Sequence, residues 1–365
     1  MDSAQRNDVG SFAFLNTDWS HGYKPQMPGG CGWYRCYLPM LQISKLGWPV
    51  GMGSPAYREQ DNLGIWVDDD TRALYGWKTV CLKLVMQRNI LPLVPKARAN
   101  GQNILYDIDD LVDGVQPDNI AYRNTDPARS PDNNRSIFRE LVAMSDTLVT
   151  STPFLYEYYR RQHRDVRMIR NGVDVQRYSM RQQAKRPVIG WVGATQWRTR
   201  DLQVLDPWLG NYLLRNKLRA WHSGDDSGGA AFAAKANVPG SLVDTWPIVP
   251  IIQYPQALQH FDIGLVPLAR NDFNEAKSCL KGLEYAASGI PFIATATGEY
   301  RWLAEQGIGR LAESPAEWMH HLDELQSLDV RMEEARRQRR IVEDKFTIDH
   351  RGEEWRKLAL EVAAR

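Results

Sequence analysis

Short apolar runs alternate with longer amphipathic segments along almost the whole chain, and this alternation limits the possible folds more than any other feature. The runs that predict strands lie at residues 11–15, 103–107, 146–151, 166–174, 187–193, 219–222, 242–245, 262–266, 291–295 and 308–311. Strands separated by helical segments are typical of βαβ units, in which a helix connects two parallel strands. The sequence therefore predicts an α/β fold built on parallel sheets.

The amphipathic segments between these runs predict helices. In the first half, residues 34–45, 73–88 and 153–161 have apolar positions at helical spacing, with a strong period over 73–88. The last stretch, residues 314–364, is helical in pattern and heavily charged. Its segment RMEEARRQRR mixes both charge signs, which indicates a solvated helix face rather than a nucleic-acid-binding arm.

The length and one polar stretch predict how the chain divides. At roughly 100–200 residues per domain, 365 residues correspond to two domains. The stretch MRQQAKRP is polar, charged and ends in proline, as linkers do. Open parallel sheets bind ligands at the carboxyl ends of their strands, so two facing domains would place a site in the cleft between them. We predict an N-terminal domain at 1–178, a linker at 179–186, a C-terminal domain at 187–345 and a final helix at 346–365.

Composition argues against several classes of protein. The net charge is +1, so no global basic field is present to hold nucleic acid. No apolar run approaches the ~18 residues of a membrane-spanning helix, and the polar, acidic N-terminus differs from a signal peptide. None of the four cysteines forms a CxxC pair, and although the spacing of Cys31 and Cys36 fits a metal or a disulfide, no second pair has the spacing of zinc ligands. We therefore expect reduced thiols, no bound metal and a cytoplasmic protein.

The most informative segment is residues 271–295, NDFNEAKSCLKGLEYAASGIPFIAT. Its pattern predicts a helix that begins near Ser278, followed by a strand. Free backbone N–H groups at a helix start favour an anion, and Ser278 would cap this start. Because Lys277 and Lys281 flank the start, a diphosphate is the expected ligand. Glu284 lies farther along the helix, where a carboxylate can accept hydrogen bonds from two ribose hydroxyls.

The run from Glu284 to Pro291 resembles the donor-binding motif of retaining GT-B glycosyltransferases similar to family 4. The first half of the motif differs, because Ala276 stands where the family has its first glutamate, and Glu275, a candidate donor-binding residue, lies one residue earlier. The chain instead has a Lys-Ser-x-x-Lys-x-x-Glu version, similar to a subgroup of bacterial and phage glycosyltransferases. The resemblance implies that Glu284 holds the nucleotide ribose.

The resemblance implies the GT-B fold, with two Rossmann-like α/β/α domains whose parallel sheets face each other across a cleft. The N-terminal domain would present the acceptor, and the C-terminal domain would bind a nucleoside diphosphate sugar. Residues 346–361 resemble the family's last helix, which crosses back to the first domain. Lys277 and Lys281 would neutralise the charge that develops on the leaving diphosphate, and no cofactor is implied.

Two more segments of the C-terminal half resemble donor-binding parts of the family. IGWVGATQWRTRDL resembles the first βα loop, where Gly193 allows close backbone approach and Arg198 or Arg200 reaches the diphosphate. Residues 243–268 resemble the loop that contacts the base. Trp246 would flank the base there or fill the core.

The N-terminal half carries a Gly-rich loop that leads into a helix. The loop contains Gly29, Gly30 and Gly32, and it lacks the Lys-Ser/Thr end of a P-loop. It resembles the loop that lies beside the diphosphate and the acceptor in the family. Arg35 lies on the following helix, where it faces either the cleft or the protein interior.

A second motif of this half, YDIDD at residues 106–110, ends a strand with three carboxylates. Asp107 and Asp109 fit the Asp-x-Asp pattern with which transferases of another fold hold a divalent ion. GT-B enzymes generally use helix dipoles and basic residues instead, so we expect no metal here. Asp107 or Asp109 would then orient an acceptor hydroxyl.

The implied reaction transfers a sugar from a nucleoside diphosphate sugar, with a UDP-sugar favoured, to an acceptor hydroxyl with retention of stereochemistry. The acceptor would be a cell-surface glycan or a virion or other protein. One alternative is a phage DNA glycosyltransferase that acts on a modified pyrimidine. Two others are a non-catalytic sugar-nucleotide or glycan-binding protein and a nucleotide-sugar epimerase of the same two-domain shape.

Overall fold

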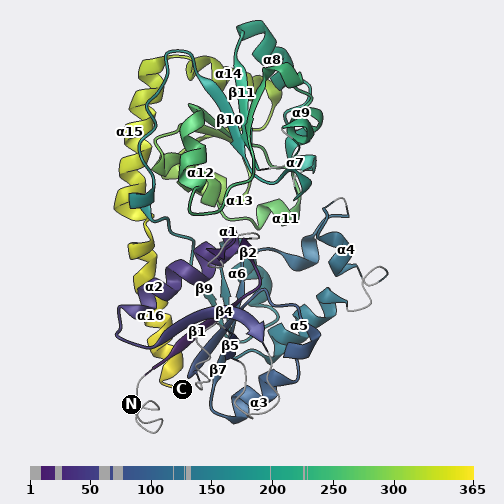
Figure 1. Cartoon of the computed structure of the whole chain (residues 1–365), viewed down its shortest axis with the longest axis vertical. Helices are drawn as coiled ribbons and strands as arrows, with labels where there is room; N and C mark the ends of the chain where they lie inside the picture. The colour runs from purple at the N-terminus through teal and green to yellow at the C-terminus, as the bar shows by residue number, and fades with distance from the viewer. Residues whose placement is uncertain are drawn as a thin grey trace. The chain divides into compact units, whose positions relative to one another are not determined.

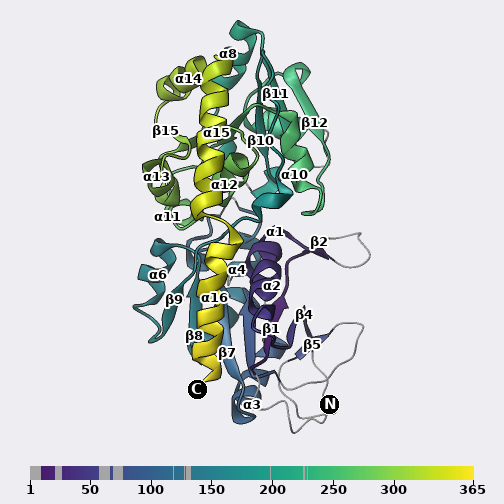
Figure 2. The same ribbon diagram turned by 90° about the vertical axis from the view of Figure 1, so that its left-hand side faces the viewer.

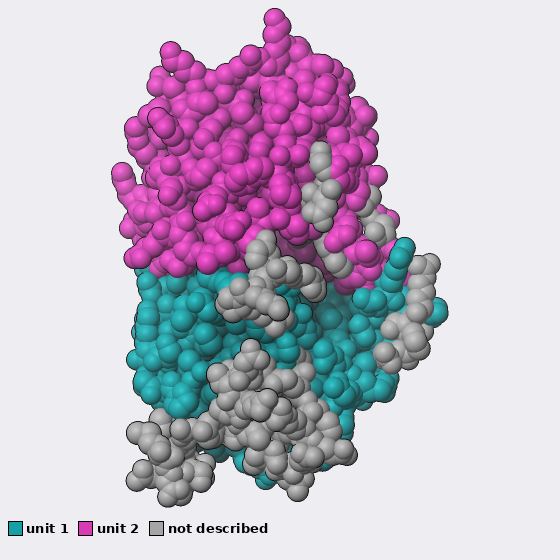
Figure 3. All heavy atoms as spheres, viewed as in Figure 1, with its two compact units in different colours: residues 1–113, 123–172, 348–365 teal, residues 114–122, 173–347 magenta. Residues whose placement is uncertain are grey.

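The computed structural model places most of the chain in two compact units. It describes residues 10–20, 27–56, 66–68, 77–117, 119–126, 128, 133–197, 199–224, 227 and 229–365. Unit 1 comprises Met1–Asp113, Arg123–Gly172 and Ile348–Arg365, and unit 2 comprises Gly114–Tyr122 and Val173–Thr347. Figure 3 colours the two units separately. The domain bounds that we proposed from the sequence stay a prediction.

Unit 1 is built on a seven-stranded sheet with the order β5-β4-β1-β6-β7-β8-β9. All neighbouring strands run parallel except the edge pair β4 and β5, which is antiparallel. The strands are β1 (Phe12–Asn16), β4 (Val50–Ala56), β5 (Trp66–Asp68), β6 (Thr79–Lys83), β7 (Asn103–Ile108), β8 (Thr147–Thr150) and β9 (Val166–Met168). A separate two-stranded sheet pairs β2 (Trp19–Ser20) with β3 (Met27–Pro28).

The expected helix over 73–88 is wrong for its described part, because Thr79–Lys83 form the central strand β6. Every residue of β6 is buried, between β1 on one side and β7 on the other. A strand covered on both faces loses the alternation of apolar and polar residues that marks a half-exposed strand. Because TVCLK lacks this alternation, the segment was predicted as part of a helix instead of a strand.

Helices cover both faces of the unit 1 sheet. On one face, α2 (Leu38–Ser44) packs beside α16 (Ile348–Ala363), as Figure 2 shows. The Phe14 ring of β1 lies 5.8 Å from that of Trp355 on α16. On the other face, Phe138 of α5 (Asn134–Met144) lies 5.6 Å from Tyr106 of β7. The remaining helical segments are α1 (Gly30–Gly32), the π-helix η2 (Trp33–Tyr37), η3 (Arg88–Ile90), α3 (Leu93–Ala99), η4 (Val112–Gly114), α4 (Tyr122–Thr125) and α6 (Pro153–Tyr159).

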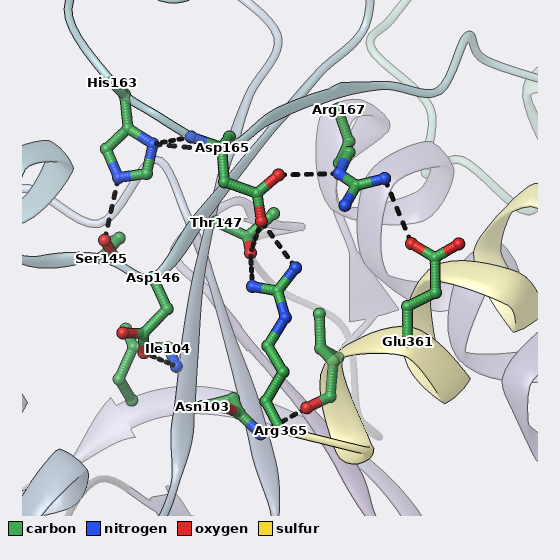
Figure 4. A network of polar contacts seen from close by, with 11 residues as sticks. Asn103, Ile104, Ser145, Asp146, Thr147, His163, Asp165, Arg167, Glu361 and Arg365 are labelled. Atoms are coloured by element: carbon green, nitrogen blue, oxygen red, sulfur yellow. Dashed lines mark hydrogen bonds and ion pairs between the residues drawn. The ribbon is translucent and has the colours of Figure 1, made fainter.

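The C-terminal residues complete unit 1 through a polar network. Arg365 donates to Asp165 Oδ2 at 2.7 Å and to Thr147 at 3.0 Å. Arg167 bridges Asp165 and Glu361 of α16, and the Asn103 side chain donates to the Val362 carbonyl. Figure 4 shows these contacts between the end of α16 and the strands. The last turn of the chain is thus held by unit 1.

Unit 2 is built on a six-stranded, fully parallel sheet with the order β12-β11-β10-β13-β14-β15. Such a sheet needs helices on its faces, and the chain supplies them between the strands. The strands are β10 (Val188–Val192), β11 (Arg219–Ser223), β12 (Val243–Trp246), β13 (Ile263–Val266), β14 (Phe292–Thr295) and β15 (Arg310–Ala312).

The core of unit 2 is rich in aromatic rings. Trp191 of β10 stacks on Phe232, and Trp208 stacks on Trp318, with ring centroids 5.8 and 5.7 Å apart. Figure 1 shows the helices around this sheet. They are α7 (Thr199–Gln203), α8 (Trp208–Asn216), α9 (Ala230–Lys235), α10 (Tyr254–Ala257), α11 (Asp272–Glu275), α12 (Leu280–Ala287), α13 (Gly298–Glu305), α14 (Pro315–Glu324) and α15 (Leu328–Lys345). Short 3₁₀ turns lie at η5 (Val175–Arg177), η6 (Thr195–Trp197), η7 (Gly240–Leu242) and η8 (Leu258–His260). Among the described residues, no helix is long and apolar enough to cross a membrane.

Candidate functional site

Two glycines meet at the carboxyl ends of neighbouring strands in unit 2. Gly193 follows β10 and Gly224 follows β11. A Cβ atom on Gly224 would lie 2.3 Å from the Gly193 carbonyl oxygen, and Gly224 has φ +133°, so a larger residue would be strained there. The carboxyl edge of an open parallel sheet is where such folds bind ligands. The two glycines allow the backbone segments after β10 and β11 to approach each other, and they leave no side chain at these two positions.

Helix α12 approaches the same edge, although it begins later than the sequence predicted. It starts at Leu280 with Cys279 as its N-cap, and no side chain caps it. Ser278 is therefore not the cap. The reason is the short preceding helix α11, whose last turn continues through the hydrogen bond from the Lys277 N–H to the Asn274 carbonyl. Residues 276–279 form the turn between the two helices.

Lys281 fastens α12 to the end of β10. Its Nζ donates to the carbonyl of Val192, the residue before Gly193. Tyr285, one turn later, accepts a hydrogen bond from the Val192 N–H at 3.3 Å. Lys277 takes a different position, with its ammonium 4.0 Å from the centre of the Phe273 ring. The structure thus brings Lys281, but not Lys277, into direct contact with the strand end beside Gly193.

Glu284 is buried on α12, with 5% of its surface exposed. Its Oε2 accepts a hydrogen bond from the Tyr254 hydroxyl at 3.0 Å. Burial and then the Glu284 charge raise the pKa of Tyr254 well above its ordinary value, so the phenol stays protonated and donates. A carboxylate held this way is oriented by the protein before any ligand arrives.

Glu275 has an interaction that the sequence did not predict. Its Oε2 accepts a hydrogen bond from the Gly298 N–H at 2.6 Å, at the start of α13, and lies 3.5 Å from Arg301. An acidic group at a helix start is favourable because of the exposed N–H groups and the helix dipole. Of the two arginines proposed for the diphosphate, Arg200 is exposed on α7, and Arg198 lies outside the described residues.

Trp246 ends β12 as part of an aromatic cluster. It is 37% exposed, and its ring lies 4.3 Å from that of His260. His260 in turn stacks on Trp221 at 5.1 Å. Partial burial, followed by the Arg181 charge, lowers the pKa of His260. Trp246 therefore both supports this cluster and presents ring surface to the solvent, beside the more exposed Ile248.

Two residues of this region were missed by sequence reasoning. Tyr254 was not singled out, because a tyrosine thirty positions before its carboxylate partner gives no local signal. Asp201 is buried and accepts hydrogen bonds from the Ala269 N–H at 2.9 Å and the Asn274 amide at 2.6 Å. It thereby ties the segment before α12 to α7. Its only sequence signal was its place directly after Arg200 in the predicted loop and helix.

The Gly-rich loop of unit 1 is held by the residues that follow β1. The Asp18 carboxylate accepts from the Gly32 N–H at 2.9 Å, and a Cβ atom on Gly29 would lie 2.1 Å from Asp18 Oδ1. A Cβ atom on Gly32 would meet the Asn16 amide. Gly30 has no such neighbour among the described residues. Two of the three predicted glycines are therefore required by packing against Asn16 and Asp18.

The helical segment that begins with α1 continues through the π-helical turn η2, a distortion that is frequent at functional sites. The turn buries Arg35, which forms a bidentate ion pair with Asp107, at 2.5 Å for Nη2 and 3.0 Å for Nε. Arg35 also donates to the Ile169 carbonyl and the Asn171 side chain. Burial raises the pKa of Asp107, and the guanidinium opposes this rise.

Arg35 and Asp107 are consequently placed in the interior, at 1% and 0% exposure, rather than at a surface that faces a substrate. The proposal that Asp107 orients an acceptor hydroxyl does not fit this position. The sequence could not reveal the pair, because its members are 72 residues apart.

Asp109 remains at the edge of the unit 1 sheet, paired with a lysine that the sequence did not single out. Lys83 at the end of β6 donates to Asp109 Oδ1 at 2.5 Å, with 3% and 10% of the two side chains exposed. Burial alone would raise the pKa of Asp109, but Lys83 holds it below its ordinary value. The Asp109 charge raises the pKa of the thiol of Cys31, an exposed residue of the Gly-rich loop. Asp18 and Asp110 act on this thiol in the same direction.

One group of described residues has the spacing of metal ligands, and it lies on α14, away from the proposed residues in sequence. Its members are His320, His321 and Glu324, whose ligand atoms lie within 4.8 Å of one another. Arg310 forms an ion pair with Glu324, so a cation already occupies the carboxylate. Asp107 and Asp109 each pair with a basic side chain as well.

Comparison with known proteins gives the fold. Neither a family model nor a curated protein matches the sequence. Among solved structures, the chain is similar to sucrose-phosphate synthase from Thermosynechococcus elongatus, with a TM-score of 0.67 and 14% identity over 97% of this chain and 99% of that chain. It is similar to HepE from Anabaena in complex with UDP-glucose, with a TM-score of 0.65 and 12% identity over 96% and 99%. A glycosyltransferase from Rickettsia africae matches with a TM-score of 0.62 and 12% identity over 97% and 99%.

Identities this low establish the architecture alone. Two parallel sheets, each with helices on its faces, match the solved structures over nearly their full length. The family 4 subgroup stays a prediction. The chain has the GT-B fold, as its sequence predicted.

Proposed function

We propose that this protein is a glycosyltransferase that moves a sugar from a nucleoside diphosphate sugar to an acceptor hydroxyl. One observation carries the proposal: Lys281 and the oriented Glu284 lie on one helix, which is bonded to the strand end beside Gly193 and Gly224. A cation at a bare backbone edge suits a diphosphate, and a buried carboxylate suits a ribose. The arrangement matches the two ends of a nucleoside diphosphate.

A UDP-sugar is the favoured donor. HepE, which has a similar fold, was solved in complex with UDP-glucose. Trp246 and Ile248 present apolar surface next to the sheet edge, as a base requires. We propose that Lys281 neutralises charge on the leaving diphosphate, and that no resident metal ion is needed. Retention of stereochemistry is proposed from the resemblance of the Glu284–Pro291 motif.

The acceptor is proposed to be an uncharged, hydroxyl-rich group of a glycan or glycoprotein. The Asp109 charge, burial, and the charges of Asp18 and Asp110 raise the pKa of the Cys31 thiol, and Lys83 opposes them, so three carboxylates and one cation act on the Gly-rich loop. This excess of carboxylates repels phosphodiesters, and this observation weighs against the alternative of DNA as acceptor. Asp109 is the carboxylate at this edge that would accept a hydrogen bond from the acceptor.

Titration calorimetry with UDP, GDP, ADP and TDP tests the donor site. We expect one of them to bind and the Glu284→Gln variant to bind it at least tenfold more weakly. Glu353→Gln, an exposed position of α16, is the matched control and should bind like the parent protein. The absence of binding by all four nucleotides would refute the proposal.

Catalysis is tested by release of UDP from UDP-glucose, UDP-galactose and UDP-N-acetylglucosamine, with and without oligosaccharide acceptors. We expect turnover with at least one donor, and EDTA should leave it largely intact. Nucleotide binding without turnover would favour the non-catalytic alternative. Loss of turnover with EDTA and recovery with Mg²⁺ or Mn²⁺ would reject the metal-independent chemistry.

A further inference from the structure

The contact between Tyr254 and Glu284 points to a selectivity that the donor motif alone does not define. Tyr254 opens α10, and Glu284 lies on α12, so the hydrogen bond of 3.0 Å joins two separate elements. The phenol is neutral and donates a hydrogen bond, which the carboxylate oxygen accepts. One oxygen of a buried carboxylate is therefore fixed by the protein itself.

The segment that carries Tyr254 is itself fastened to the rest of unit 2. The Ser223 hydroxyl at the end of β11 donates to the Pro247 carbonyl at 2.9 Å. Arg177 donates to the Ile251 carbonyl at 2.5 Å. These bonds fix the backbone at two points between Trp246 and Tyr254. The phenol consequently acts from a held position rather than from a free loop.

Without its phenol partner, Glu284 would have more rotational freedom and would lose a donor in a buried place. A buried acceptor that loses its partner carries an unfavourable desolvation energy, and it relaxes toward any other donor within reach. The hydrogen bond therefore matters most for the direction in which the carboxylate points. Direction is what decides whether a carboxylate meets both hydroxyls of a ribose or only one.

We propose that Tyr254 is a positioning residue that aims Glu284 at a ribose diol, so that this protein selects ribonucleoside over 2′-deoxyribonucleoside diphosphate donors. The inference rests on the proposed donor site. A site built to hydrogen-bond a hydroxyl rejects an analogue that lacks it, because the buried carboxylate then loses one of its hydrogen bonds. With a charged acceptor, loss of the 2′-hydroxyl should weaken binding on the order of 10- to 100-fold.

The experiment compares three matched nucleotide pairs by titration calorimetry: UDP with 2′-deoxy-UDP, GDP with 2′-deoxy-GDP, and ADP with 2′-deoxy-ADP. The parent protein should bind the ribonucleotide of its preferred base about 10- to 100-fold more tightly than the deoxy form. In Tyr254→Phe this ratio should fall toward one. With the matching nucleotide sugar, the variant should raise KM more than it lowers kcat, because ribose contacts are present before and during the reaction.

Tyr212→Phe is the matched control. The Tyr212 hydroxyl donates to Asp323 Oδ1 and accepts from the Gln326 side chain, both at 2.8 Å, so this variant also loses a partly buried phenol–carboxylate hydrogen bond, here between α8 and α14. It should keep the parent preference for the ribonucleotide. Thermal unfolding of both variants measures the purely structural effect of losing one such bond.

An unchanged ratio in Tyr254→Phe would overturn the role of Tyr254, and equal binding of the two forms by the parent protein would overturn the selectivity. A fall of the ratio in Tyr212→Phe as large as in Tyr254→Phe would also reject it, because general loosening would then be the cause. If neither these six nucleotides nor TDP binds the parent protein, the proposed donor site itself fails, which is a distinct result. Binding of TDP alone, which lacks the 2′-hydroxyl, would keep the donor site and overturn the selectivity.

Discussion

Charged side chains near the carboxyl ends of the strands have different partners in the two sheets. In unit 1, Arg35 pairs with Asp107 and Lys83 pairs with Asp109, so each cation meets a carboxylate. In unit 2, Lys281 contacts a backbone carbonyl and Glu284 contacts a phenol, both of them neutral groups. The contacts described at the two edges thus differ: a charge meets an opposite charge in unit 1, and a charge meets a neutral group in unit 2.

This difference distinguishes charged side chains that stabilise the fold from charged side chains that can bind a ligand. A buried ion pair gains little net stability, but loss of one partner leaves an unpaired buried charge and is strongly destabilising. A hydrogen bond to a neutral carbonyl does not cancel the positive charge of a lysine. We therefore expect substitution of the fully buried Arg35–Asp107 pair in unit 1 to act on folding, and substitutions at the unit 2 edge to act on the donor.

The largest effect is expected from Arg35→Met. The substitution leaves the buried Asp107 without its cation and should lower the free energy of unfolding by about 3–5 kcal/mol, as measured by urea denaturation. Lys45→Met is the control, since Lys45 forms an exposed ion pair with Asp349 at 2.7 Å and should lose less than about 1 kcal/mol. Full stability of Arg35→Met with lost turnover would instead make Arg35 a substrate ligand and break the comparison.

The second effect concerns the opposite edge. Lys281→Met should lower kcat/KM with the nucleotide sugar on the order of 100-fold, because a positive charge at the developing oxyanion is removed. Lys345→Met, at an exposed position of α15, should leave kcat/KM unchanged. Steady-state kinetics with the preferred donor measure both. A large loss of stability without a specific loss of kcat/KM would place Lys281 among the structural charges.

Gly224→Ala tests whether the close backbone approach at the unit 2 edge is needed. The new methyl group would lie 2.3 Å from the Gly193 oxygen at a φ of +133°, so we expect a loss of about 1–3 kcal/mol in unfolding free energy and weaker nucleotide binding. Gly240→Ala has open space around its Cβ position, so its effect should be within about 0.5 kcal/mol. Equal effects of the two alanines would show that the close approach is unimportant.

The smallest effect is expected at the C-terminal network of Figure 4. Burial alone would raise the pKa of Asp165, but hydrogen bonds from Arg167, Arg365 and Thr147 hold it below its ordinary value. A depressed pKa contributes stability above the unfolded value of about 3.9, and this contribution is lost as the pH falls below it.

Asp165→Asn should therefore cost less than about 1 kcal/mol at pH 7, since its partners Arg167 and Arg365 are more than a third exposed and solvent screens both ion pairs. The difference between the variant and the parent protein should shrink as the pH falls below about 4. Thermal unfolding across this pH range is the measurement. A difference that grows on acidification would reverse the assigned sign.

Much of the fold could be predicted because parallel strands and their helices leave local patterns. The run FAFLN and the helix that follows the Gly-rich loop are readable in this way. The pattern failed at Thr79–Lys83, since a strand buried on both faces has no alternation to read. Burial in three dimensions, rather than local propensity, decided that segment.

The candidate site divided along similar lines. Glu284 and Lys281 belong to one contiguous motif, so their spacing on a helix was visible in the sequence. Tyr254, Lys83 and Asp18 were not singled out, because each forms its hydrogen bond with a residue that lies far away in the chain or on another element. No local rule connects Arg35 to Asp107, and their pairing placed both residues in the interior instead of at a substrate.

The return of α16 to unit 1 has a consequence for biosynthesis. Trp355, Leu358 and Val362 belong to the same core as Phe12 and Phe14, so the first strand made must wait for the last helix. The 175 residues of Val173–Thr347 emerge in between, which takes roughly 10–35 s at the usual rates of translation. During that interval the nascent chain exposes an apolar sheet face that α16 later covers. We expect chaperones to bind the chain mainly during this interval.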